Sequence, residues 1–236
     1  MKKILGCIRR ACEDFDLIQD GDRIGVGVSG GKDSLVLLYA LARLRAFYPK
    51  PFELVAVTLD YQFGGVPGDF SAVAELCKAL DVEYIVKPTN LWEVIFVTRK
   101  EKNPCSLCAK MRRGILHDTA KAHGCNKVAL GHHLDDAAET FMINLLRGGQ
   151  IGCFSPVSYL SNKDLYLIRP LVFATEKEVA AAARRLSLPI VKSKCPADKV
   201  TERQNVKELL QTLEKDYPAL REKIVGALQR GEIDSW

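Results

Sequence analysis

The segment that most constrains the fold of this chain is residues 25–38, GVGVSGGKDSLVLL. Ile24, Val26 and Val28 alternate with glycines, which predicts a buried strand, and the long apolar segment 34–47 predicts a helix. A glycine-rich turn between a strand and a helix is typical of α/β proteins that bind nucleotides. We therefore expect a parallel sheet with a ligand-binding loop at the end of one strand.

The loop fits neither of the two most common phosphate-binding patterns. A Walker A loop needs G-x-x-x-x-G-K-[ST], but position 26 is valine and position 33 is aspartate. The glycines at 25, 27 and 30 spell G-x-G-x-x-G, yet the next acid at a strand end, Asp60, lies well beyond the usual spacing of about 20 residues. A dinucleotide fingerprint is therefore a weak match.

The remaining pattern, S-G-G-K-D-S, has the chemistry of an anion site. Small residues expose backbone N–H groups at the start of a helix, where the helix dipole also favours negative charge. Lys32 adds a cation, and Asp33 is a candidate Mg²⁺ ligand, directly or through water. Asp60 is expected to face the same crevice, its alternative role being that of a turn residue. The predicted phosphate-binding residues are Ser29, Gly30, Gly31, Lys32, Asp33 and Ser34.

Strands and helices alternate along the rest of the chain. We predict strands at 52–60, in EYIVKP and in NKVALGHH, with helices over 69–80 and 106–123. The C-terminal part is expected to hold a hairpin around 157–168, a helix over 175–187, a short strand in PIVKS and two terminal helices. This order predicts an α/β fold whose parallel sheet carries helices on both faces, with a helical C-terminal extension.

We expect a single domain over residues 1–236. It would consist of an amphipathic N-terminal helix (1–20), a nucleotide-binding core (21–150) and a C-terminal part with the terminal helices (151–236). The loops 29–33, 60–68 and 131–136 would meet at the carboxyl ends of the strands, where such sheets bind ligands.

Composition indicates the cellular compartment and the kinds of partner and chemistry to expect. Nearly half of the residues are hydrophobic, and no apolar run approaches the about 20 residues that cross a bilayer. The start, MKKILGCIRRACEDFD, has charges where a signal peptide has its apolar stretch, so we expect a cytoplasmic protein. Its net charge of +5 permits a nucleic-acid partner. Eight cysteines in a reducing compartment indicate metal, cluster or redox chemistry, not disulfides.

Three cysteines are candidate ligands. Cys105 and Cys108 form a C-x-x-C pair, which suits a zinc half-site, a redox pair, a cluster half-site or two cysteines at a helix start. A zinc ribbon would need a second C-x-x-C, and the sequence has none. With Cys195, three thiolates would suit a 4Fe-4S cluster that leaves one iron open. The other cysteines, Cys7, Cys12, Cys77, Cys125 and Cys153, are expected to be structural.

A histidine pair and two acids form a further motif, GHHLDDAAET. His132 and His133 precede Asp135 and Asp136 at a predicted strand end and helix start. The acids are candidates for holding Mg²⁺ or orienting the attacking groups, and the histidines for contacting phosphate. Without other motifs, a capped helix with polar decoration would be the simpler interpretation.

Basic residues flank the candidate cysteines on both segments. If the three cysteines converge, these segments form a positive rim around them, which suits an RNA backbone. A solvated basic face is the alternative for either run alone. The candidate RNA-binding residues are Lys110, Arg112, Arg113, Lys192, Lys194 and Arg203.

Together, SGGKDS, CSLCAKMRRGIL, ALGHHLDDAAETF and KCPADKVTERQ resemble the PP-loop ATP pyrophosphatases, most closely the tRNA 2-thiocytidine synthetases. The resemblance runs from about Asp14 to Arg230. It implies ATP-dependent transfer of sulfur to an anticodon-loop cytidine, with pyrophosphate leaving into the S-G-G-K-D-S loop. It implies a 4Fe-4S cluster on Cys105, Cys108 and Cys195.

The resemblance also implies roles for individual residues and partners. Lys32, Asp60 and Asp135 are expected to act in catalysis, and His132 and Asp135 to contact ATP. ATP, Mg²⁺ and the cluster are the expected cofactors, with tRNA as substrate and sulfide or a cysteine desulfurase as sulfur donor. A homodimer is expected. The alternatives are uridine thiolation, a PP-loop ligase or amidotransferase on another substrate, and a nonenzymatic ATP-binding or redox-sensing module.

Overall fold

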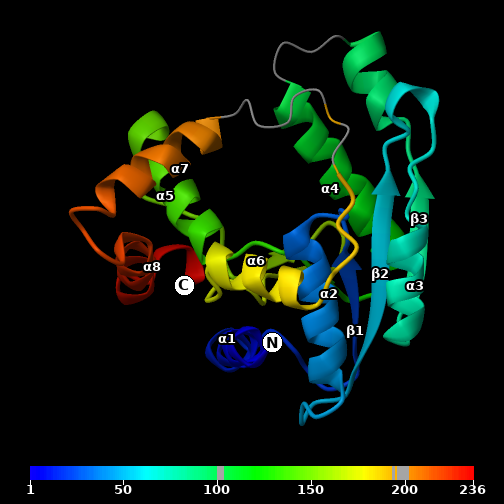
Figure 1. Ribbon diagram of the computed structural model, residues 1–236, viewed down its shortest axis with the longest axis horizontal. Coiled ribbons are helices and arrows are strands. Elements are labelled where there is room, and N and C mark those ends of the chain that lie inside the picture. Colours follow the sequence, from blue (N-terminus) through cyan, green and yellow to red (C-terminus); the bar gives the residue numbers. More distant parts are fainter. Residues whose placement is uncertain (100–103, 193–194, 196–201) are drawn as a thin grey trace.

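A computed structural model describes residues 1–99, 104–192, 195 and 202–236 of the chain. Figure 1 shows a central sheet with helices packed on it and a group of helices, α5, α7 and α8, beyond one end. The strands are β1 (Asp22–Gly27), β2 (Phe52–Asp60), β3 (Glu83–Pro88), β4 (Lys127–Ala129), β5 (Val157–Leu160) and β6 (Leu165–Ile168). The α-helices are α1 (Lys2–Phe15), α2 (Lys32–Arg45), α3 (Ser71–Ala79), α4 (Pro104–Ala122), α5 (Leu134–Gly148), α6 (Glu176–Arg185), α7 (Glu202–Leu213) and α8 (Leu220–Arg230).

The sheet confirms the predicted α/β fold. Its strand order is β3-β2-β1-β4-β6-β5, and every neighbouring pair is parallel except the β5–β6 hairpin. The chain runs from β1 outward through β2 to β3 and then returns to pair β4 with the other side of β1. This reversal between β1 and β4 is the switch point at which open α/β sheets bind ligands.

The two faces of the sheet carry separate apolar cores. Ile24 and Val26 of β1 face the core that includes α1, α2 and α6, whereas Val55 and Val57 of β2 face the core under α4. The strand glycines explain how α4 approaches so closely. A Cβ on Gly25 would lie 3.0 Å from Ala120, and one on Gly27 would lie 3.0 Å from Leu116. The glycines within β1 therefore serve helix packing, and neither is needed for contact with a dinucleotide.

A third core joins the C-terminal helices to α5. Ala138 of α5 packs with Val206 and Leu210 of α7 and with Ile224 of α8. Figure 1 shows these helices away from β2 and β3. The predicted helical extension is therefore confirmed.

The observed helices and strands begin and end within a few residues of their predicted bounds, and among the described residues one predicted strand is absent. The strand predicted in PIVKS is wrong: residues 189–192 form no strand. Instead the backbone N–H of Val191 donates a hydrogen bond of 3.0 Å to the carbonyl of Gly30. The β-branched residues of this segment follow the surface of the loop after β1. No helix in the described parts of the chain is long and apolar enough to span a membrane.

A buried ion pair fixes the start of β1 to β4. Lys127 Nζ lies 2.8 Å from Asp22 Oδ2 and donates to the carbonyl of Leu17 at 2.9 Å. Asn126 donates to the other carboxylate oxygen at 2.7 Å. Because Asp22 and Lys127 are both buried, each charge depends on the other for compensation.

Replacing Lys127 with methionine should therefore destabilise the fold strongly. We expect a loss of about 3–5 kcal/mol in the free energy of unfolding, because Asp22 would remain as a buried uncompensated charge. Urea unfolding measures the loss. The control is Lys163→Met, which removes an ion pair with exposed Asp118 and should cost less than about 1 kcal/mol. Equal losses in the two variants would contradict the role given to the buried pair.

Candidate functional site

The loop after β1 is held open by its own serines. Ser34 Oγ accepts from the backbone N–H of Ser29 at 3.2 Å and donates to the carbonyl of Gly31 at 2.9 Å. Gly31 is the N-cap of α2, so the helix begins at Lys32 with its first N–H groups directed at the loop. A helix start with N–H groups directed at a loop is the kind of arrangement that binds anions, and phosphate binding here stays a prediction.

Two glycines are required by close contacts at this loop. Gly30 has a φ of +82°, and a Cβ there would lie 2.9 Å from the Cβ of Val191. At Gly131, after β4, an added Cβ would lie 3.1 Å from backbone atoms of Asp33 and Ser34. The loop after β1 thus touches Val191 at Gly30, and the start of α2 touches the residue after β4 at Gly131, and a side chain at either glycine would force these segments apart.

Lys32 lies at the centre of an ion-pair chain. Its Nζ is 3.0 Å from Asp33 Oδ1 and 3.3 Å from Glu176 Oε1. Glu176 also pairs with Lys207 of α7 at 2.6 Å. Burial lowers the pKa of Lys32, but Asp33 and Glu176 outweigh burial and hold it above its ordinary value. Lys32 is therefore a stable cation beside the loop.

Asp33 offers a carboxylate oxygen suited to a metal ion. Its Oδ1 is buried and, within the described part of the chain, accepts no hydrogen bond. The neighbouring groups are Lys32 and the Nε2 of His133, which lies 3.8 Å away. The Lys32 ammonium, 3.0 Å from this oxygen, balances its charge, and a carboxylate oxygen at this position is of the kind that Mg²⁺ prefers.

The acids of the GHHLDDAAET motif hold neighbouring helices. Asp135 Oδ2 accepts from the backbone N–H of Glu176 at 2.7 Å, and its Oδ1 lies 3.4 Å from Arg221. Asp136 accepts from Arg203 at 2.7 Å and forms a capping box with His133 at the start of α5. Asp135 therefore reaches the first turn of α6, and its predicted contact with ATP stays a prediction.

His132 and Arg169 are two polar residues with buried nitrogen atoms, and of the two only His132 was a candidate from the sequence. The Nδ1 of His132 is buried without a hydrogen-bond partner in the described chain, as is the Nε of Arg169. Burial lowers the pKa of His132 to about 4 and that of Arg169 to about 10, so at neutral pH the imidazole is neutral and the guanidinium charged. Both side chains approach the ring of Phe154. In the sequence, the only sign of a buried role for Arg169 is its position directly after the apolar run LYLI.

Asp60 organises the loop that follows β2. Its carboxylate accepts from the backbone N–H of Gln62 at 3.0 Å and from that of Gly68 at 3.1 Å. The carbonyl of Asp60 accepts from Thr89 after β3. These bonds support the turn role for Asp60, and its catalytic role stays a prediction.

The three candidate cysteines lie on two segments that approach each other. Cys105 and Cys108 are near the start of α4, and Cys195 follows the segment that contacts Gly30. Burial raises the pKa of Cys108, nearby Arg112 opposes this, and negative charge on Cys195 and Cys105 adds to it. Among the described residues, no three or more His, Cys, Asp or Glu side chains lie together closely enough to hold a metal ion, and this includes the three candidate cysteines. The assignment of Cys105, Cys108 and Cys195 as ligands of a 4Fe-4S cluster therefore stays a prediction.

The candidate RNA-binding residues differ in their surroundings. Lys110, Arg112, Arg113 and Lys192 are exposed, and Arg112 also approaches Tyr61. Arg203 is committed to ion pairs with Asp136 and Glu139. Lys194 lies outside the described residues. The positive rim near the cysteines is thus carried by α4 and Lys192.

Comparison with known proteins agrees with this geometry. Residues 6–213 match the PP-loop domain family. The tRNA-cytidine(32) 2-sulfurtransferase of Geobacter sulfurreducens is 40% identical over 233 residues, covering 96% of this chain and 89% of that protein. The enzyme of the same name from Ralstonia nicotianae is 39% identical over 226 residues, covering 93% and 70%.

Solved structures show the same fold. The U34-tRNA thiolase NcsA from Methanococcus maripaludis, solved with its [4Fe-4S] cluster, has a TM-score of 0.79 and 29% identity, covering 97% of this chain and 78% of that one. The NH3-dependent NAD synthetase of Campylobacter jejuni has a TM-score of 0.52 at 18% identity, covering 97% and 91% of the two chains, and is similar in fold.

The contact between Gly30 and Val191 can be tested by substitution. Gly30→Ala should destabilise the fold by more than Gly64→Ala, because both place alanine at a positive φ but only position 30 meets another residue. We expect about 1–2 kcal/mol for Gly64→Ala and a further 1–3 kcal/mol or so for the overpacking at Gly30. Urea unfolding and ATP titration would measure stability and binding.

A second substitution separates the contact from the backbone strain. Adding Val191→Ala to Gly30→Ala should restore part of the lost stability, because it removes the methyl groups that the new Cβ meets. Strictly additive losses in the double variant would show that the contact is not responsible.

Proposed function

The chain belongs to the PP-loop family, among the tRNA-cytidine(32) 2-sulfurtransferases, and we propose that it is an enzyme that uses ATP to replace the C2 oxygen of a tRNA cytidine with sulfur. The observation that carries the proposal is the joining of two sites. Val191 bonds to Gly30 of the phosphate loop, and the same segment continues to Cys195 beside Cys108. A base held between the loop and the cysteines would meet both reagents.

The first step would be adenylation of the base. The C2 oxygen attacks the α-phosphorus of ATP, the bond from that phosphorus to the α–β bridging oxygen breaks, and pyrophosphate leaves. Lys32 and the N–H groups at the start of α2 stabilise the negative charge that grows on the leaving group. Asp33 is the proposed residue for Mg²⁺, which binds the same phosphates.

In the second step, a sulfur nucleophile would attack C2 of the activated base, and AMP would leave with the original oxygen. Adenylation matters because it converts a poor leaving oxygen into a phosphate ester that departs readily. The chain's part is to position the base and exclude water. Neutral His132 and the charged Arg169, both with unpartnered buried nitrogens, are proposed to donate hydrogen bonds near the reacting base or phosphate.

Cys105, Cys108 and Cys195 are the proposed ligands of a 4Fe-4S cluster. When bound through three cysteines, such a cluster supplies an iron position that is open to sulfur. Asp60 and Asp135 are proposed as positioning residues, since their carboxylates hold the loop after β2 and the start of α6. Sulfide or a cysteine desulfurase is the proposed sulfur donor.

The proposed RNA contacts are those of the positive rim. Lys110, Arg112 and Arg113 on α4 and exposed Lys192 would neutralise phosphates, with Lys194 and Arg203 nearby in the sequence. A homodimer is also proposed. Exposed Leu145, Leu146 and Ile151 leave apolar surface at the end of α5 that a second copy would cover.

Nucleoside mass spectrometry tests the reaction directly. Unmodified tRNA would be incubated without oxygen with the cluster-loaded protein, ATP, Mg²⁺ and sulfide, and then digested. We expect a thiocytidine. A thiouridine would move the target to the base named for NcsA, and no thionucleoside with a verified cluster would overturn the proposal.

Cys195→Ala should abolish thiolation while leaving ATP binding intact. The expected reason is loss of one of three cluster ligands at a site that does not touch the nucleotide. Iron content, the visible spectrum and nucleoside analysis provide separate readouts. The matched control is Cys7→Ala, which removes a half-buried cysteine of α1 outside the site. Full activity in Cys195→Ala would exclude the third-ligand assignment.

Lys32→Met should lower the adenylation rate by about 10²–10³-fold, the usual loss when one charge-stabilising group is removed. Release of pyrophosphate measures this step independently of sulfur transfer. Lys177→Met, an exposed lysine in the first turn of α6, is the control and should keep the normal rate. A similar rate in both variants would contradict the assigned role of Lys32.

A further inference from the structure

Four aromatic side chains form a continuous ladder on the loops after β2 and β3. Tyr61 stacks on Phe63 with ring centroids 5.3 Å apart and planes 3° from parallel. Phe63 meets Trp92 edge-on at 5.6 Å, and Trp92 stacks on Phe96 at 4.8 Å. The ladder therefore joins two loops that are separate in the sequence.

The ladder is not part of an apolar core. In the described chain, Phe63, Trp92 and Phe96 join none of the three cores, and only Tyr61 packs against one of them. The other run of rings, Phe173, Phe15, Trp236 and Phe154, lies against the largest core. Large aromatic rings kept half exposed outside a core are typical of a binding surface.

The backbone under the ladder is also unusual. Trp92 immediately precedes a π-helix, Glu93–Thr98, which contains Phe96. Leu91 and Ile95 anchor this segment in the interior, so the rings of Trp92 and Phe96 are displayed on a fixed base. Such π-helical turns are rare and occur often at functional sites.

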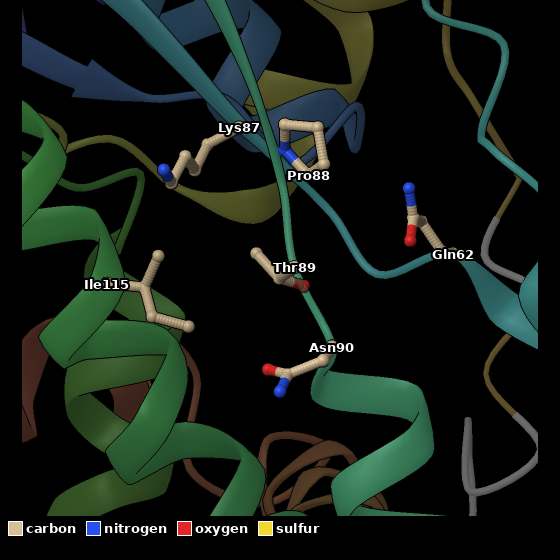
Figure 2. A pocket seen from close by; sticks show the side chains of 6 residues that line it. All are labelled: Gln62, Lys87, Pro88, Thr89, Asn90 and Ile115. Carbon is tan, nitrogen blue, oxygen red and sulfur yellow. The ribbon is translucent and has the colours of Figure 1, made fainter.

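A shallow, open pocket of about 380 Å³ is lined by residues that neighbour the ladder in the sequence, and its volume is close to the lower limit of small-ligand pockets. Gln62, Thr89, Asn90 and Lys87 line it together with Pro88 and Ile115. Figure 2 shows the amide of Asn90 pointing toward α4, which carries Ile115. Side-chain amides can donate and accept hydrogen bonds at once, as the edge of a nucleobase requires.

The ladder also adjoins the proposed sulfur site. Tyr61 lies near Cys108 and Arg112, and burial raises the pKa of Tyr61 above its ordinary value while Arg112 opposes this. Exposed Lys87 and Arg112 add positive charge at either side. Stacking rings, a pocket that contains two side-chain amides, and cations together match single-stranded RNA, since unpaired bases stack on aromatic side chains while lysine and arginine neutralise the backbone.

We propose that Tyr61, Phe63, Trp92 and Phe96 stack the unpaired bases of the tRNA anticodon loop, and that the cavity beside them holds one of those bases by its edge. This inference rests on the proposed function for the identity of the RNA. The stacking surface itself is tested without thiolation, so the two can fail separately.

Trp92 provides a direct probe. An unpaired RNA oligonucleotide should quench its fluorescence, whereas a fully paired duplex of the same composition should quench it weakly. The quench should disappear from Trp92→Phe, which keeps a stacking ring and removes the indole, leaving Trp236 as the remaining tryptophan. Equal quenching by the two RNAs, or quenching that persists in Trp92→Phe, would overturn the proposal.

Binding of unmodified tRNA gives the second measurement. Trp92→Ala and Phe63→Ala should each weaken the Kd by about 5- to 150-fold and leave ATP binding unchanged. The matched control is Tyr159→Ala. Tyr159 is an exposed residue of β5, the edge strand opposite β3, and its ring centroid lies 4.7 Å from that of Tyr166. Normal tRNA affinity in both ladder variants would overturn the proposal even if thiolation is confirmed. Loss of affinity without any thiolation would support the ladder and reject the proposed reaction.

Discussion

The contact between Gly30 and Val191 is the constraint on which the rest of the site depends. It holds the segment that contains Val191 against the loop that precedes α2. The backbone N–H of Val191 donates to the carbonyl of Gly30, and the absence of a Cβ on Gly30 makes room for the Val191 side chain. Gly131 performs the same function from the β4 side, where it lies against Asp33 and Ser34. The phosphate loop is thus enclosed by two chain segments, and neither can move away without breaking a backbone contact.

Charge at this point is balanced before a nucleotide binds. Lys32 is neutralised by Asp33 and Glu176, and Glu176 is shared with Lys207. Burial raises the pKa of Glu176, but the two lysines outweigh burial and lower it below its ordinary value. An incoming triphosphate would therefore compete with fixed carboxylates for Lys32, and a metal ion at Asp33 would relieve that competition.

The carboxyl edge of the sheet carries two chemistries that must meet. The loop after β1 is the proposed phosphate site, while the loops after β2 and β3 carry the aromatic ladder, and Tyr61 of the ladder lies near Cys108 of α4. Asp60 connects them, because its carboxylate holds the loop after β2 and its carbonyl bonds to Thr89 after β3. Through these bonds Asp60 holds together the two loops that carry the aromatic ladder.

Periodicity and motif spacing are local properties, so the sequence alone predicted the α/β fold, which is confirmed, and offered the loop after β1 and the cysteines as candidate sites. It could not determine which distant groups each residue would meet. PIVKS has the composition of a strand, but its Val191 bonds to a loop instead of a sheet edge. Asp135 has the chemistry of a metal ligand, but α6 and Arg221 occupy its carboxylate. Arg169 and the ladder drew no attention in the sequence, since burial without a partner and stacking between two loops exist only once the chain has folded. Tertiary structure decided those roles because they depend on contacts between residues far apart along the chain.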